Sequence, residues 1–180
     1  MNHTDHVDLL RKGIPHVGGV WADFGSGTGA FTLALADLIS STGTIYSIDQ
    51  NATALKEQTL AMQRRFPTTQ LQTLHANFTN PIALPPLDGI VMANALHFVH
   101  EKDGVIEQLH GYLKPEGRLI LIEYNVDHGN TWVPYPLSFP TWKILAEKHD
   151  FQHTLMLATY PSRFLGEIFS ALSFKSLQDP

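Results

Sequence analysis

Short apolar runs alternate along this chain with segments in which apolar residues recur every three or four positions. The runs end at glycines, acids or amides, which is typical of buried strands, and the second pattern is typical of amphipathic helices. Strands are predicted at 20–22, 44–49, 71–75, 87–93, 118–124, 151–159 and 166–175. Helices are predicted at 5–12, 30–39, 52–66, 101–113 and 140–149, the first of them capped by Thr4 or Asp5. The alternation indicates an α/β fold with a parallel sheet.

The turn after the first predicted strand is rich in glycine and reads Asp23-Phe24-Gly25-Ser26-Gly27-Thr28-Gly29. Glycines let backbone N–H groups come close to a ligand, and the start of the next helix adds partial positive charge. The spacing of Gly25, Gly27 and Ala30 also fits a dinucleotide fingerprint, but the Asp23 carboxylate would repel a pyrophosphate. S-Adenosylmethionine carries an ammonium, a sulfonium and a carboxylate but no phosphate, and it suits this turn better. The alternative is a glycine-rich turn that binds nothing.

Polar residues also follow the next three predicted strands. Asp49, which ends the second strand beside Gln50, lies a little over twenty residues after the first glycine of the turn. At that separation an acid reaches a ribose diol, although a strand-end aspartate can instead cap the following helix. After the third strand, Asn77 offers an amide to an adenine amino group and Phe78 offers an apolar flank. Asn94 follows the fourth strand.

With these motifs the chain resembles the class I S-adenosylmethionine-dependent methyltransferases, of the small-molecule type similar to the ubiquinone and menaquinone biosynthesis enzymes. The resemblance extends from about residue 19 to 175, and residues 113–119 are similar to the family's turn into its fifth strand. It implies a Rossmann-like, seven-stranded, mostly parallel sheet with helices on both faces and a C-terminal antiparallel hairpin. Ligands are then expected at the carboxyl ends of the strands, where the strand order reverses.

The resemblance also implies a role for each motif. The glycine loop would hold the methionine part of the cofactor, Asp49 the ribose, and Asn77 and Phe78 the adenine, while the backbone near Asn94 would meet the amino group. An Asp is commoner in the family at position 77, but the carbonyl oxygen of Asn can still accept a bond from adenine. The expected cofactor-binding residues are Asp23, Gly25, Ser26, Gly27, Gly29, Asp49, Gln50, Asn77, Phe78 and Asn94. The cofactor is S-adenosyl-L-methionine and its product is S-adenosyl-L-homocysteine.

Two segments are predicted to shape the site of the methyl acceptor. His97, just past the fourth strand, can take a proton from an acceptor hydroxyl, or else it packs or caps the next helix. Residues 123–139 are rich in aromatic and polar side chains, which suits an uncharged or aromatic acceptor but is also common in plain packing. The expected acceptor-site residues are His97, Glu123, Tyr124, His128 and Tyr135. The one tight histidine cluster, at 97–101, lacks a third ligand at a zinc-enzyme spacing, so no metal site is predicted.

Composition narrows the function classes. A chain of 180 residues with 43% hydrophobic residues predicts one domain at 19–180, after an N-terminal helix and lead-in at 1–18. A net charge of −5 gives no basic surface for nucleic acid, and no apolar run approaches membrane-spanning length. Cysteine is absent, which excludes a thiolate nucleophile and fits a cytoplasmic location.

The predicted function is in-line transfer of a methyl group to a small organic acceptor, a reaction that depends mainly on positioning. Two alternatives from other classes are a non-catalytic cofactor-binding module or partner subunit of the same fold, and a nicotinamide-dependent oxidoreductase. The first strand is preceded only by residues 1–18, which can cover little of the acceptor. A homodimer is the simplest way to close the site.

Overall fold

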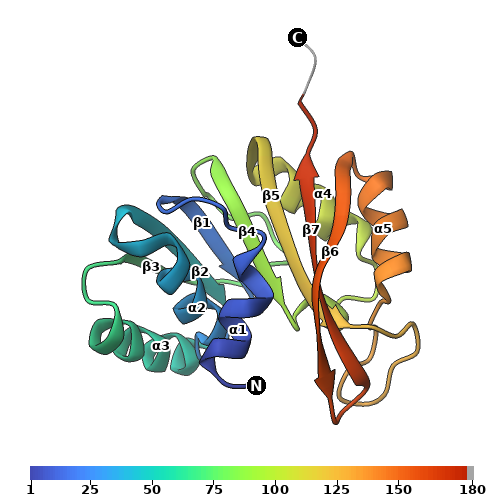
Figure 1. The fold of residues 1–180 in the computed structure, drawn as a ribbon, viewed down its shortest axis with the longest axis horizontal. Helices are drawn as coiled ribbons and strands as arrows, with labels where there is room; N and C mark the ends of the chain where they lie inside the picture. Colours follow the sequence, from blue (N-terminus) through green and yellow to red (C-terminus); the bar gives the residue numbers. More distant parts are fainter. Residues whose placement is uncertain (178–180) are drawn as a thin grey trace.

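The computed structural model describes residues 1–177, and its centre is one seven-stranded sheet in the order β3-β2-β1-β4-β5-β7-β6 (Figure 1). The strands are β1 Gly19–Phe24, β2 Gly43–Asp49, β3 Gln70–His75, β4 Leu87–Ala93, β5 Leu113–Tyr124, β6 Phe151–Ser162 and β7 Gly166–Lys175. Strands β1 to β5 pair in parallel, and β7 runs antiparallel between β5 and β6. The predicted Rossmann-like α/β fold with its closing antiparallel hairpin is confirmed.

Helices cover both faces of the sheet. They are α1 His3–Arg11, α2 Ala30–Ile39, α3 Ala52–Arg65, α4 Asp103–Tyr112 and α5 Phe139–Lys148, with short 3₁₀ turns η1 Ser40–Thr42 and η2 Leu96–Phe98. One buried cluster joins α1, α2 and α3 to the sheet, and a second joins α4 and α5 to the opposite face. Figure 1 shows α2 and α3 over the β1–β3 half of the sheet, α4 and α5 over the other half, and α1 beside α2 near the middle, where it also contacts β6 and β7. None of the helices in the described range 1–177 is both long enough and apolar enough to cross a membrane.

The central strands are buried on both faces, which explains their unbroken apolar runs. In β4, Ile90 and Met92 belong to the cluster beneath α4 and α5, whereas Val91 belongs to the cluster beneath α1 and α2. In β5, Leu121 and Ile122 divide in the same way. The two-residue alternation of a strand therefore supplies both hydrophobic cores from one run of sequence.

Several predicted boundaries are wrong. Helix α1 begins two residues earlier than expected and is capped by Asn2, whose side chain accepts from the backbone N–H of Asp5 in a capping box. Strand β5 already begins at Leu113, because the segment expected to be a turn pairs with β4 at Leu87. The hairpin strand β6 extends through the expected turn to Ser162.

The order of the sheet reverses between β1 and β4. The chain adds β2 and β3 on one side of β1 and then returns to place β4 on the other side. The carboxyl ends of β1 to β4 therefore meet at one edge, and the turns that leave them diverge there. In Figure 1 the same edge, at the bottom of the view, also receives the loop between β5 and α5 and the turn between β6 and β7.

Candidate active site

A cavity of about 260 Å³ lies at this switch point. Residues from the turns after β1, β2, β3 and β4 surround it, so the fold rather than any one loop creates it. Its lining residues are Gly25, Asp49, Gln50, Asn77, Phe78, Thr79, Asn94, Ala95, Phe98 and Val99. Six of the ten residues predicted to bind the cofactor are in this lining.

The glycine-rich turn needs glycine for its conformation and its contacts. Gly25, Gly27 and Gly29 all have positive φ, at 73°, 53° and 90°, where a Cβ is strained. A Cβ on Gly25 would also lie 2.5 Å from the Cβ of Ala95 across the cavity. The backbone N–H groups of Gly25 and Ser26 donate to the carbonyl of Ile48, which ties the turn to the end of β2.

Asp49 connects the turn to β2 through its side chain. Its Oδ2 accepts from the backbone N–H of Gly27 at 2.8 Å and its Oδ1 accepts from that of Asn51 at 2.7 Å. The cap of α3 is Asn51, whose side chain accepts from Thr53 and Ala54. The alternative interpretation of Asp49 as the helix cap is therefore wrong, and its carboxylate lines the cavity. A carboxylate has about four acceptor positions, so two remain for a diol.

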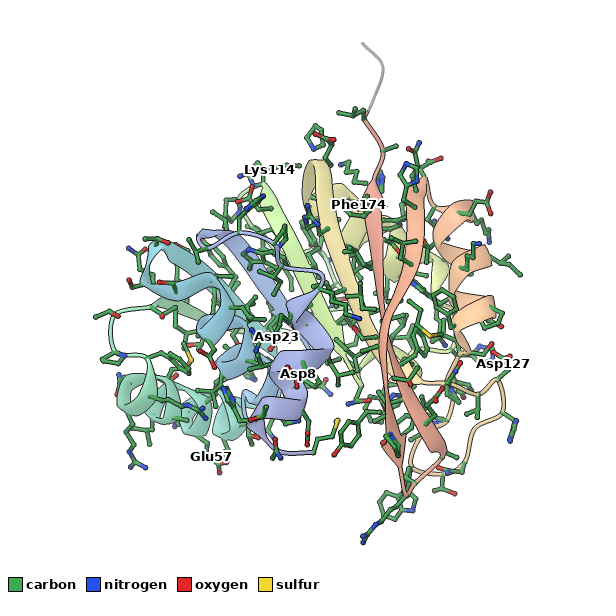
Figure 2. All side chains as sticks on the ribbon, viewed as in Figure 1. Asp8, Asp23, Glu57, Lys114, Asp127 and Phe174 are labelled. Atoms are coloured by element: carbon green, nitrogen blue, oxygen red, sulfur yellow. The ribbon has the colours of Figure 1, made fainter. Side chains whose placement is uncertain are left out.

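Asp23 lies beneath the turn and outside the cavity lining. It is 1% exposed, and Figure 2 shows it within the body of the molecule. Burial raises the pKa of its carboxyl to about 7, while a 2.6 Å hydrogen bond from the Thr32 hydroxyl opposes the shift and the nearby Asp49 charge adds to it. Near neutral pH this group therefore exchanges between a neutral and a negatively charged form.

Asn94 supplies a buried acceptor at the other side of the cavity. It has a φ of 49°, a left-handed conformation that Asn tolerates better than most residues. Its Oδ1 is fully buried and has no hydrogen-bond partner within residues 1–177. Leaving such an acceptor unpaired costs about 1–3 kcal/mol, so the site is suited to a ligand that brings a donor.

His97 and Glu123 form a buried pair behind η2. The Nδ1 atom of His97 lies 2.8 and 3.0 Å from the two carboxylate oxygens of Glu123. These oxygens also accept from the backbone N–H groups of His97 and Tyr124 at 3.2 and 2.9 Å. Both side chains are almost inaccessible, at 3% and 0% exposed. The carboxylate thereby fixes the proton of His97 on Nδ1 and leaves Nε2 as an acceptor.

Aromatic rings and one lysine surround this pair. The His97 ring lies 4.2 Å from that of Phe98 and 5.8 Å from that of Tyr124. Burial, and then the Glu123 charge, raise the pKa of the Tyr124 hydroxyl. The Lys102 ammonium lies 5.8 Å from the centre of the Tyr135 ring, and burial lowers its pKa although Glu123 opposes this. The arrangement offers an apolar surface with one proton acceptor.

Comparison with known proteins identifies the family. A family model described as a methyltransferase domain matches residues 22–119, which is more than half of the chain. The chain belongs to the methyltransferase-domain family. Its fold is that of the class I S-adenosylmethionine-dependent methyltransferases.

Individual relatives agree with this assignment. The chain is 28% identical over 154 residues to the ubiquinone/menaquinone biosynthesis C-methyltransferase UbiE of Pseudoalteromonas translucida, covering 83% of this chain. It spans 53% of that relative and 40% of its counterpart from Haemophilus ducreyi. Among solved structures, the YcgJ protein of Bacillus subtilis superposes with a TM-score of 0.79 at 12% identity, covering 97% of this chain and 100% of the other. A methyltransferase from Aquifex aeolicus gives 0.74 at 20% identity, covering 94% and 89%.

The structure of this methyltransferase domain does not bring all the predicted site residues together. His97, Glu123 and Tyr124 are in contact, and the Tyr135 backbone N–H donates to the His97 carbonyl at 3.0 Å. His128 lies on the exposed part of the β5–α5 loop and makes no side-chain hydrogen bond within residues 1–177. Asp23, Ser26, Gly27 and Gly29 lie around the turn but do not line the cavity.

Sequence reasoning missed several residues of the domain's site. Lys102 follows His97 closely, and its spacing offered no signal beyond proximity. Gln58 was missed because it lies in the middle of a helix, in a pattern that predicts a partly exposed polar position. It is in fact fully buried and contacts three hydroxyl groups beneath the glycine turn.

Proposed function

We propose that this protein binds S-adenosylmethionine in the switch-point cavity and transfers its methyl group to a small, uncharged acceptor held beside His97. The observation that carries the proposal is the adjacency of two sites on one turn. Ala95, Phe98 and Val99 line the cavity, while His97, between them in sequence, is paired with Glu123. The bound cofactor supplies an electrophilic methyl group on a good leaving group.

The cavity residues fit each part of the cofactor. The Asp49 carboxylate is proposed to accept from the ribose hydroxyls, and Phe78 and Asn77 to flank and hydrogen-bond the adenine. The unpaired Oδ1 of Asn94 favours the ammonium group, and so does the ionised form of Asp23 beneath the turn. Gln50, which lines the cavity next to Asp49, is proposed to contact the ribose as well.

On the acceptor side, His97 is proposed to act as a general base. Its Nε2 makes none of the hydrogen bonds described for residues 1–177, and the atom is not among the fully buried unpaired groups. Glu123 holds the ring so that a hydroxyl proton can be received at Nε2, and the resulting imidazolium is stabilised by the carboxylate. Removing that proton makes the acceptor a stronger nucleophile.

The surroundings support an aromatic or otherwise uncharged acceptor. Tyr124, Phe98, Tyr135 and Phe164 offer rings near this pair, the last at 6.0 Å from Tyr124. The relatives named above act in ubiquinone and menaquinone biosynthesis as C-methyltransferases, which is compatible with an aromatic acceptor that carries a hydroxyl. A small-molecule acceptor, a cytoplasmic location and a homodimer stay predictions, and we propose no nucleic-acid or membrane partner.

Isothermal titration calorimetry tests the cofactor half of the proposal. S-Adenosylhomocysteine is expected to bind and NAD is not, because Asp23 lies beneath the turn that a pyrophosphate would have to approach. The opposite order of affinities would favour the oxidoreductase. Formation of S-adenosylhomocysteine from S-adenosylmethionine with a panel of phenols and hydroxylated rings then separates an enzyme from a non-catalytic module.

A further inference from the structure

A closed set of hydrogen bonds lies beneath the glycine-rich turn, and Gln58 of α3 is at its centre. Its Nε2 donates to the Thr32 hydroxyl at 2.7 Å and to the Ser47 hydroxyl at 2.6 Å. Ser47 donates to Ser26 at 2.7 Å, and Ser26 donates back to Oε1 of Gln58 at 3.2 Å.

All of these groups are removed from solvent. Gln58, Thr32 and Ser47 are 0% exposed, and Ser26 of the turn is 9% exposed. Buried polar networks are costly unless every member is satisfied. Both hydrogens of the Gln58 amide and its oxygen are used, and with the amide in this orientation each bond in the ring has the direction given above.

The hydrogen bonds continue from this ring through Thr32 to Asp23. The Thr32 hydroxyl has a single hydrogen, and its acceptor side is occupied by the Gln58 amide. In this orientation of the amide the hydrogen goes to Oδ2 of Asp23, at 2.6 Å, and Asp23 accepts it. If the Gln58 amide were reversed, Thr32 would face two acceptors with one hydrogen, and Asp23 would have to carry a proton itself.

We infer that Gln58 is a positioning residue for cofactor binding: by orienting the Thr32 hydroxyl toward Asp23 it favours the charged form of Asp23 beneath the turn that receives the cofactor's ammonium group. Gln58 also packs against Gly29, because a Cβ at that glycine would collide with its side chain. The inference rests on the proposed function in assigning the ammonium to this turn. Its first half, control of the Asp23 charge, stands on the hydrogen bonds alone.

The groups that act on Asp23 come from the elements packed around it. Thr32 of α2 hydrogen-bonds to it through its hydroxyl and its backbone, and both bonds favour the carboxylate. Asp49, at the end of β2, is the charged group that acts on it, and it favours the neutral form, as burial does. Removing the Thr32 hydroxyl therefore leaves its backbone bond as the remaining effect in favour of the carboxylate, against burial and the Asp49 charge.

The test is a carbon-13 NMR titration of the Asp23 carboxyl in the free protein, assigned with Asp23→Asn. Gln58→Met removes the amide with little change in volume, and Gln63→Met, an exposed position on the same helix, is the matched control. The acid dissociation constant of Asp23 is expected to fall about tenfold in Gln58→Met and to stay unchanged in Gln63→Met. An unchanged constant in Gln58→Met would overturn the inference.

A second pair of variants guards against a folding failure. Thr32→Val should lower the acid dissociation constant of Asp23, as Gln58→Met does. Thr32→Ser should titrate as the wild type does, because serine keeps the hydroxyl. If Thr32→Ser also departs from wild type by as much as Thr32→Val, the effect is on packing and the inference is wrong.

Binding of S-adenosylhomocysteine is then measured at pH 7 for the same variants. An affinity loss of about fivefold at pH 7 that recovers at higher pH supports the role in cofactor binding, because the ionised fraction of Asp23 would fall from about a half to about a tenth. A loss that is independent of pH would contradict it. If the wild type does not bind this ligand at all, the proposed function fails, whereas the NMR titration still decides whether Gln58 controls Asp23.

Discussion

The cofactor cavity is formed by the turns that leave β1 to β4, whereas the His97 side is formed by η2, the end of β5 and the loop that leads to α5. In the first region, every contributing segment follows a parallel strand at the switch point, and the pairing of the strands fixes their positions. In the second region, residues distant in sequence meet. His97 contacts Glu123, 26 residues away, and the Tyr124 ring lies 6.0 Å from that of Phe164.

This difference shows how one domain can keep its cofactor and change its acceptor. Asp49 and the turn glycines hold each other through backbone bonds, so substitutions there disturb the sheet edge itself. Trp132 and Tyr135 of the β5–α5 loop are 74% and 42% exposed, so their side chains contribute little to the buried core. Acceptor specificity is therefore expected to reside mainly in residues 125–138, which can vary without loss of the cofactor site.

The largest expected effect separates the two regions. His97→Gln should reduce the turnover number by about 10²–10⁴-fold, the usual contribution of a general base, and leave the affinity for S-adenosylhomocysteine unchanged. His100→Gln is the matched control, because the side chain of His100 is 68% exposed and close in sequence. The measurement is the rate of S-adenosylhomocysteine formation with the best acceptor of the panel. Full turnover in His97→Gln would leave His97 a packing residue.

A second substitution acts on the cofactor side. Asp49→Ala should weaken S-adenosylhomocysteine binding by about 1.5–3 kcal/mol, the usual contribution of hydrogen bonds to a charged group. Asp8→Ala, on the exposed surface of α1 (Figure 2), should have no effect. Calorimetry measures both. Normal binding by Asp49→Ala would mean that its carboxylate serves only the Gly27 turn.

Asp23 gives a pH-dependent prediction. Because its folded pKa is raised to about 7, its contribution to stability is fully present below about pH 4 and is lost as the pH rises through 7. Asp23→Asn cannot ionise, so it should be more stable than wild type at pH 8 and equal to it near pH 4. Urea unfolding at the two pH values measures the difference. A constant difference would show that Asp23 is not the titrating group.

The smallest expected effect distinguishes two glycines of the turn. Gly27 has open space around its Cβ position, so Gly27→Val should cost about 1–2 kcal/mol of stability through its positive φ. It should lose more cofactor affinity than stability, because a shift of the turn would disturb the bond from the Gly27 N–H to the cavity-lining Asp49 carboxylate. At Gly29 a Cβ would meet Gln58, so Gly29→Ala should lose mainly stability. Thermal melts and calorimetry on both variants test this; equal losses in Gly27→Val would limit Gly27 to the turn.

Much of the cofactor half could be predicted from the sequence. Helix α2, β4 and β7 have the predicted boundaries, because each is bounded by glycine or by a clear change of pattern. Gly25, Asp49 and Asn94 could be placed at one edge because parallel strands present their carboxyl ends together. The boundary of β5 could not, since its pairing with Leu87 depends on neighbours in space, whereas the cap of α1 at Asn2 is a local signal that was assigned to Thr4 or Asp5 instead.

The sequence by itself determined the fold class, the switch-point edge and the residue types around the cofactor, because these follow from local periodicity and from residues next to strand ends. Only the tertiary structure decided the rest. It paired His97 with Glu123, left His128 at the surface, and buried Gln58 beneath the turn. The physical reason is that a hydrogen bond between distant residues depends on how the strands and helices pack, and no spacing along the chain encodes it.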